Sequence, residues 1–399
     1  MSSPGYVECD AEAGGQARGQ QITIPGRKSL STRGAFMRRR NLQLDLLRCV
    51  AILGVLVTHL ASFRPPNWWW DRLLTQGTWS GVDLFFVISG YLISGLLFSE
   101  FQKHGRINFG RFAIRRALKL YPTLYVLVFG VALNRLLVDS TDVTERIVRP
   151  LLHDIFFVQS YLRGTYGHFW SLSVEEHFYV LLPLTLYLMI RNAPSGETNP
   201  FRRLPSIFLA VCIFSLSARL ITGLLIQPYD HHTHLFPTHL RLDSLLFGVL
   251  ISYWQHFHSE VFRAAINRIR PLLLPSSLVL IAPAFFLPLE NFSIYTIGLS
   301  LLYLGYGCLM LAMLQMPLHA EGFAGRLLWP FSYIGQHSYS IYLFHISIME
   351  FLMQYGLLGD RRGIFLYFAS TILGGILLSK FIEFPVLHLR RPNFPGSGG

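Results

Sequence analysis

The sequence predicts an all-α membrane protein, a polytopic bundle of about ten transmembrane helices with both termini in the cytoplasm. Apolar runs of about 20 residues, each long enough to cross a bilayer as one helix, recur along the chain. Charged residues make up only 14% of the chain, against about 25% in soluble domains. Basic residues lie in blocks between the apolar runs, a pattern that sets the orientation of membrane helices. We therefore expect a multi-pass protein embedded in the lipid bilayer of the cell membrane, specifically the bacterial inner membrane.

The net charge of +12 does not indicate a nucleic-acid partner. Such a partner requires a basic face on a water-soluble domain, and the basic residues instead flank apolar runs. The four cysteines are scattered and show neither metal-ligand spacing nor a disulfide framework. We therefore expect no nucleic-acid binding and no metal site. Composition does not predict the oligomeric state.

Residues 1–40 are rich in Gly, Ser, Arg and Gln and lack an apolar period. They are predicted to form a disordered basic cytoplasmic tail. The tail ends in three consecutive arginines, Arg38, Arg39 and Arg40, which favour a cytoplasmic N-terminus. The transmembrane domain is predicted to cover residues 41–388, and residues 389–399 form a short C-terminal tail.

The first predicted span, residues 44–63, carries Arg48 and His59 eleven positions apart. Eleven residues make about three helical turns, so the two side chains share one face to within roughly 20° and lie roughly 16 Å apart. Ionisable groups inside a span are costly and usually mark a site that faces the protein interior. The alternative is that Arg48 anchors a helix end at the membrane surface and that His59 is a core histidine.

The remaining spans follow in order, and each is an apolar run bounded by polar residues. They are predicted near residues 80–98, 121–138, 170–190, 207–226, 240–257, 272–289, 294–315, 334–353 and 364–382.

Two acidic groups open predicted spans. Asp83 lies in the string GVDLFFVISGYLI, where it either orients a histidine or caps the helix. Glu175 and Glu176 are adjacent in FWSLSVEEHFYV, so they point about 100° apart and only one need face the interior. The alternative is that both carboxylates complement the positive end of the helix dipole.

The densest basic segment between spans runs from residue 103 to residue 119. It contains Lys103, Arg106, Arg111, Arg115, Arg116 and Lys119. It is either a topology signal attracted to anionic lipid or a set of donors for the phosphates of a cytosolic ligand. Two later strings also carry polar groups in apolar surroundings: RLDSLLFG with Arg241, and SYSIYLFH with Tyr339 and His345.

Taken together, these strings resemble the acyltransferase family 3 membrane proteins. The resemblance covers residues 44–385. It rests on Arg48, ten residues and then His59; on GVDLFFVISGYLI; and on Arg115, Arg116, Lys119 and Pro122 in an Arg-Arg-x-x-Arg-x-x-Pro-like segment. The string WSLSVEEHFY also matches, with His177 where the family often has Gln. Lys119 replaces an arginine of the pattern, which keeps the charge but loses the bidentate fork.

The resemblance implies an O-acyltransferase that takes an acyl group, most commonly acetyl, from a cytosolic acyl-CoA. The acceptor would be a hydroxyl of a carbohydrate or glycolipid, and no permanently bound cofactor is implied. Arg48, Arg115, Arg116 and Lys119 would bind the CoA phosphates, and His59 would act as general base. Asp83 or Glu175 would orient the imidazole. Trp170, Ser171 and Tyr339 would line the acceptor path.

Two other functions remain open at the level of the sequence. A transporter of a polar solute would use His59, Glu175 and Asp83 as a proton relay. A non-catalytic membrane scaffold would leave the cost of Arg48 and His59 unexplained.

Overall fold

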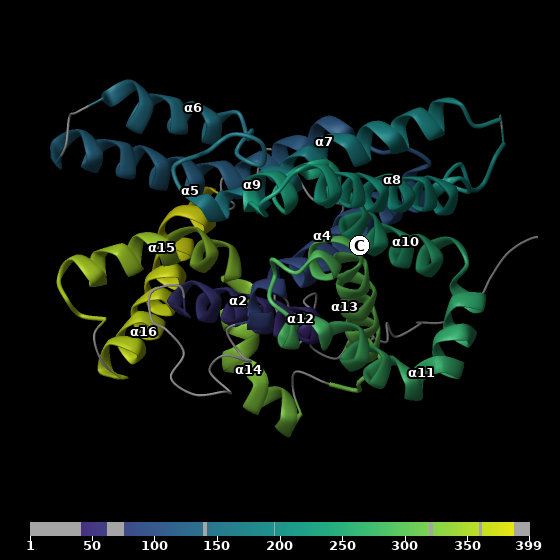
Figure 1. Cartoon of the computed structure of the whole chain (residues 1–399). Helices are drawn as coiled ribbons and strands as arrows, with labels where there is room; N and C mark the ends of the chain where they lie inside the picture. The colour runs from purple at the N-terminus through teal and green to yellow at the C-terminus, as the bar shows by residue number, and fades with distance from the viewer. Residues whose placement is uncertain are drawn as a thin grey trace, which may run out of the picture. The chain divides into compact units, whose positions relative to one another are not determined.

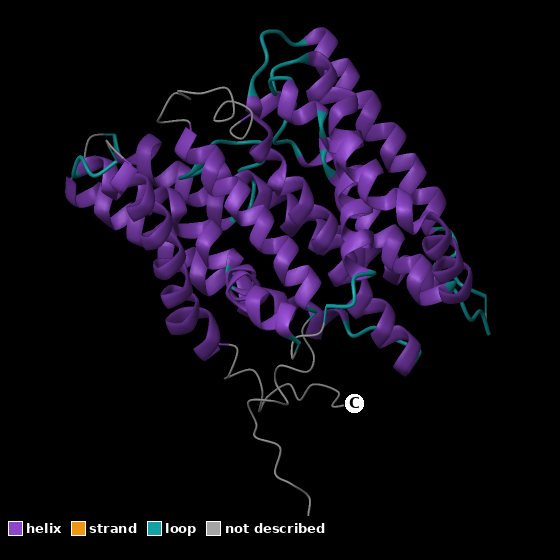
Figure 2. Ribbon diagram, turned by 90° about the horizontal axis from the view of Figure 1, so that it is seen from below, coloured by secondary structure: helices purple, strands orange, loops and turns teal. Residues whose placement is uncertain are grey.

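The structure, a computed structural model, describes residues 41–61, 76–138, 142–194, 196–318, 322–358 and 361–386. The predicted N-terminal tail and the C-terminal tail, residues 389–399, lie outside these residues. Every regular element of the described part is helical, with no β-strand among these residues (Figure 2). The all-α prediction is therefore confirmed.

The longer helices are, in chain order, α2 (Leu42–Ala61), α4 (Gly81–His104), α5 (Phe109–Val138), α7 (Trp170–Arg191), α8 (Leu204–Leu225), α10 (Leu242–Phe257), α11 (Ser259–Ile281), α13 (Leu299–Leu314), α14 (Phe323–Gln336), α15 (Ser338–Gln354) and α16 (Arg361–Leu378). The short ones are η1 (Thr78–Ser80), η2 (Thr144–Val148), α6 (Arg149–Ile155), η3 (Gly167–Phe169), α9 (His231–His234), η4 (Thr238–Leu240), α12 (Pro283–Phe286), η5 (Ile294–Gly298) and η6 (Ser379–Glu383).

Seven helical segments of the described part are long and apolar enough to cross a membrane. They are Leu42–Ala61, Thr78–His104, Phe109–Val138, Leu204–Leu225, Ser259–Phe286, Ile294–Leu314 and Arg362–Val386. A helix also covers each of the other three predicted spans, namely α7, α10 and α15. These three fall outside the seven, α10 and α15 being only 16 and 17 residues long. The count of ten spans and the cytoplasmic placement of both termini stay predictions.

The central helices are α2, α4, α10 and α13, which pack on one another (Figure 1). The contact between α4 and α10 depends on glycine. A Cβ atom on Gly90 of α4 would collide with the carbonyl oxygen of Leu245, and one on Gly248 of α10 would collide with that of Val87. Only glycine lets the two backbones approach this closely.

The peripheral helices α5, α8, α11 and α16 expose many apolar side chains, among them Leu137, Leu225, Val279 and Phe365. Such faces are expected where a helix borders lipid.

One helix that the sequence did not predict, α14, packs against α2. It precedes α15, because the predicted span 334–353 is divided at His337.

Candidate active site

Two adjoining cavities lie between these helices, and Val82 and Tyr342 line both of them. The first has a volume of about 100 Å³ and the second about 320 Å³. Since α2 contributes Arg48 to the first cavity and His59 to the second, one helix face supplies both sites. The shared wall of Val82 and Tyr342 places the two cavities next to each other.

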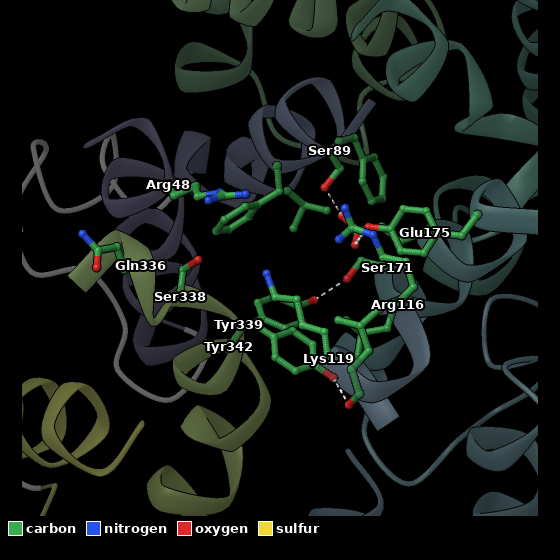
Figure 3. A pocket seen from close by; sticks show the side chains of 16 residues that line it. Arg48, Ser89, Arg116, Lys119, Ser171, Glu175, Gln336, Ser338, Tyr339 and Tyr342 are labelled. Atoms are coloured by element: carbon green, nitrogen blue, oxygen red, sulfur yellow. Dashed lines mark hydrogen bonds between the residues drawn. The ribbon is translucent and has the colours of Figure 1, made fainter. Parts of the chain in front are cut away.

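The first cavity brings together six polar residues that the sequence singled out (Figure 3), namely Arg48, Arg116, Lys119, Ser171, Glu175 and Tyr339. Arg48 enters from α2, and Arg116 and Lys119 enter from α5. Arg48 also pairs with Asp45 on its own helix, with an N–O distance of 3.3 Å. Arg116 lies over the ring of Tyr179 at 5.4 Å. Three cationic side chains around a small space can hold an anionic group.

Glu175 is the acidic residue on the wall of this cavity. It accepts hydrogen bonds from the Ser89 hydroxyl and the Tyr179 hydroxyl, both at 2.8 Å. Its neighbour Glu176 points to α5 and accepts a hydrogen bond from Tyr121 at 3.1 Å. The two adjacent carboxylates thus face different helices, as their 100° separation predicts.

Tyr339 and Ser171, which were predicted to line the acceptor path, have partners that connect helices. The Tyr339 hydroxyl donates to the carbonyl oxygen of Leu120 at 2.6 Å. The Tyr342 hydroxyl donates to the carbonyl oxygen of His168 at 2.6 Å. It also lies 2.7 Å from the Ser171 hydroxyl (Figure 3). Because the single Tyr342 proton is used at His168, Ser171 is the donor of the second bond. Arg115 lies on α5 outside the lining of both cavities.

The second cavity contains His59, Asp83 and Trp170. His59 Nδ1 lies 2.9 Å from the Val55 carbonyl oxygen and 3.2 Å from His345 Nε2. The ring of His168 completes a cluster of three imidazoles, with centroids 6.1 Å from His59 and 4.6 Å from His345. No group of three or more His, Cys, Asp or Glu side chains in the described part is arranged to hold a metal ion.

Asp83 has a different partner from the one considered for it. Its carboxylate accepts a hydrogen bond from Arg241 at 2.6 Å, and both side chains are buried. The partners of His59 are Val55 and His345, and those of Glu175 are Ser89 and Tyr179. In the described structure neither carboxylate is therefore bonded to the imidazole that it was expected to orient.

Aromatic rings dominate one wall of the second cavity. Trp170 stacks on Phe236 with a centroid distance of 4.9 Å and an interplanar angle of 10°. The Arg241 guanidinium lies 5.6 Å from the centroids of both Trp170 and Phe86. Stacked rings next to a charged, hydrogen-bonding pair suit a ligand that has both apolar and hydroxyl surfaces.

The sequence did not single out His168, although it lies at the second cavity. It precedes α7 in η3, where no helical period connects it with His59. Burial, reinforced by the neighbouring His59, lowers the pKa of His168 well below its usual range. His345 and Arg241 were noted as polar groups in apolar strings, but only the packing of α15 and α10 brings them to this site.

The chain is similar in sequence to known acyltransferases. The family described as an acyltransferase domain matches residues 41–380. One relative is a protein of Staphylococcus aureus (strain COL) that is named as a provisional O-acetyltransferase. It is 32% identical to this chain over 373 residues, and the match covers 86% of this chain and 56% of that protein. The O-acetyltransferase OatA of Staphylococcus aureus (strain NCTC 8325 / PS 47) is 27% identical over 364 residues, with the same coverage.

The chain thus spans little more than half the length of these curated relatives. No solved structure matches it. The family match covers most of the chain, including all of the residues around both cavities. The chain therefore belongs to the acyltransferase family that this domain defines.

Proposed function

We propose that the protein is a membrane O-acyltransferase that moves an acyl group, acetyl in the first instance, from cytosolic acyl-CoA to a hydroxyl of a carbohydrate or glycoconjugate. The observation that carries this proposal is the pair of adjoining cavities. One is lined by three cationic side chains and the other by an imidazole, and they share Val82 and Tyr342. A donor with phosphates at one end and a thioester at the other needs such an arrangement.

The first cavity is the proposed donor site. Its space of about 100 Å³ holds only part of an acyl-CoA, so the nucleotide would lie at the mouth and the pantetheine arm inside. Arg48, Arg116 and Lys119 would bind phosphate oxygens, with the arginines offering paired N–H donors. This cavity would open to the cytoplasm of a bacterial inner membrane, the side on which acyl-CoA is available.

His59 is the proposed general base. Its Nε2 takes the proton of the acceptor hydroxyl while the hydroxyl oxygen attacks the thioester carbonyl carbon. The carbon–sulfur bond then breaks, and the CoA sulfur leaves with the proton that His59 returns. The products are the acyl ester and free CoA. A two-step route through an acylated His59 balances equally and is the competing mechanism.

The second cavity is the proposed acceptor site. Its volume of about 320 Å³ lies at the small end of the range for ligand pockets and suits one or two sugar units. Trp170 and Phe236 would supply the apolar part of the wall beside a sugar ring, and Asp83 and Arg241 lie at the same cavity. Ser171 and Tyr339 would line the route between the sites, as the resemblance implies. The O-acetyltransferase names of the relatives support acetyl as the group transferred.

The test is transfer of label from radiolabelled acetyl-CoA in membranes that contain the wild type, His59→Ala or Arg48→Ala. Surface glycans and extractable lipids are counted separately. We expect labelled product with the wild type and none with His59→Ala. With Arg48→Ala we expect less labelled product, and high concentrations of acetyl-CoA should restore it. A matched control is His256→Ala, because His256 is a partly buried histidine of α10 that lines neither cavity. Equal label with the wild type and His59→Ala would remove His59 as the base.

A wild type that transfers no label from acetyl-CoA is tested next with longer acyl-CoAs. If no acyl-CoA supports transfer, a transporter becomes the better hypothesis. Its proton relay was expected to join His59, Glu175 and Asp83, yet Glu175 lies at the first cavity while the other two lie at the second.

A further inference from the structure

We infer that His345 is a positioning residue for His59: it holds the imidazole of His59 in the one neutral tautomer whose Nε2 can act as a base. This inference rests on the proposed function of His59. It concerns a residue on α15, 286 positions away in the sequence, which no motif containing His59 includes.

The first step concerns the proton on His345. Its Nδ1 lies 2.5 Å from the carbonyl oxygen of Tyr342. A carbonyl oxygen can only accept a hydrogen bond, so Nδ1 of His345 carries the proton. In a neutral imidazole the other nitrogen then has the lone pair. His345 Nε2 is therefore a hydrogen-bond acceptor that points at His59.

The second step transfers this constraint to His59. Its Nδ1 has two neighbours, the Val55 carbonyl oxygen at 2.9 Å and His345 Nε2 at 3.2 Å. Both are acceptors, so Nδ1 of His59 must be the donor and its Nε2 must carry the lone pair. In the opposite tautomer the Nδ1 lone pair would face the lone pairs of the Val55 carbonyl oxygen and of His345 Nε2. Val55 lies on the same helix as His59, whereas His345 contacts the ring from another helix.

The position of His345 is itself well supported. Its side chain is fully buried, and the carbonyl that it bonds belongs to Tyr342. The Tyr342 hydroxyl is in turn bonded to the His168 carbonyl oxygen and to the Ser171 hydroxyl (Figure 3). The wall between the two cavities and the partner of the base are therefore parts of one turn of α15. A buried, doubly constrained ring is what an orienting partner requires.

The same contact is used during the reaction. When Nε2 of His59 takes the proton of the acceptor, the ring becomes an imidazolium that still donates from Nδ1 to His345. Other groups also face the cluster: His168 from η3, Asp83 from α4, His231 from α9 and Arg241 at the start of α10. All four of these residues are retained in every variant of His345.

The experiment compares the wild type with His345→Leu and His345→Gln in reconstituted membranes, following acyl transfer from labelled acetyl-CoA. Leucine removes both nitrogens, whereas the glutamine amide can accept from His59 and donate to Tyr342 at the same time. We expect His345→Leu to lower kcat by roughly 10- to 100-fold, the effect of losing an outer-shell partner or part of general-base catalysis, without changing the KM for acetyl-CoA. His345→Gln should recover most of the loss.

The pH profile provides a readout that a structural role would not move. In His345→Leu the Nδ1–H of His59 loses one of its two acceptors and keeps the Val55 carbonyl oxygen, so the imidazolium is less stable than in the wild type. His345→Leu should therefore move the acidic limb of the kcat profile to lower pH, and His345→Gln should leave it in place. Thermal unfolding identifies a variant that fails to fold, in which case His345→Gln alone decides. His256→Leu is the matched loss of a histidine that lines neither cavity.

The outcomes separate the two hypotheses. If the wild type transfers no acyl group, or if His59→Ala is as active as the wild type, the proposed function fails. Suppose instead that the wild type transfers the acyl group and His59→Ala does not. The inference about His345 is then wrong if folded His345→Leu keeps the kcat and the pH profile of the wild type. A folded His345→Gln as inactive as a folded His345→Leu would also overturn it.

Discussion

Asp83 and Arg241, 158 positions apart in the sequence, form a buried ion pair with an N–O distance of 2.6 Å. Asp83 lies in the first turn of α4, and Arg241 lies directly before α10. A second buried pair, Arg219 with Asp243 at 2.7 Å, joins α8 to the same end of α10. The two pairs thus connect α4 and α8 to one end of α10, and Asp83 and Arg241 also line the second cavity.

Breaking the Asp83–Arg241 pair from one side should destabilise the protein strongly. Arg241→Met leaves a carboxylate buried without its cation, which typically costs about 3–5 kcal/mol. The double variant Asp83→Leu/Arg241→Met removes both charges and should recover much of the loss, because apolar replacements of whole pairs are often neutral. Thermal unfolding in detergent measures both. A double variant less stable than Arg241→Met would show that the pair does not act as a unit.

Arg116→Gln should weaken the use of acyl-CoA without affecting chemistry on a smaller donor. A hydrogen bond to a charged group is worth about 1.5–3 kcal/mol, so KM for acetyl-CoA should rise about 10-fold or more. The KM for acetylpantetheine, a thioester without phosphates, should not change. Arg115→Gln is the neighbouring comparison, since Arg115 lies outside both cavities, and should have the smaller effect. Equal losses with both donors would contradict a phosphate-binding role.

Gly90→Ala should separate α4 from α10. The added methyl group meets the backbone carbonyl of Leu245, which cannot rotate away as a side chain can, and overpacking typically costs about 1–3 kcal/mol. The control is Gly130→Ala on α5, where no atom lies within 4 Å of the new Cβ. That substitution should be neutral or stabilise by about 0.5–1 kcal/mol. The two unfolding temperatures, measured side by side, are expected to move in opposite directions or by clearly different amounts.

Acidification should destabilise the protein partly through His168. Burial, reinforced by His59, lowers the pKa of His168 from its ordinary 6.5, so the folded state binds fewer protons than the unfolded state as the pH falls below that value. The contribution of His168 to stability is therefore complete above about pH 6.5 and declines at lower pH. His168→Gln should reduce the difference in unfolding free energy between pH 7 and pH 5. An unchanged difference would mean that other groups control the acid sensitivity.

Several features of the site could be predicted from the sequence because they are local. The eleven-residue spacing of Arg48 and His59 depends only on helix geometry, and one helix does carry both to adjoining cavities. The divergence of Glu175 and Glu176 is equally local. The all-α fold follows from apolar runs whose backbone groups must be satisfied within each segment in lipid.

Tertiary packing decided the partners. Nothing near Asp83 in the sequence indicates Arg241, and nothing near His59 indicates His345 or His168, because helical periodicity relates residues only along one helix. Arg115 and Arg116 are adjacent in a basic string, yet only Arg116 reaches the first cavity, since neighbours on a helix point about 100° apart. By itself the sequence determined the helical fold class and the polar residues of α2. The packing of α4, α10 and α15 decided which side chains those residues meet, because the contacts form between helices that lie far apart in the chain.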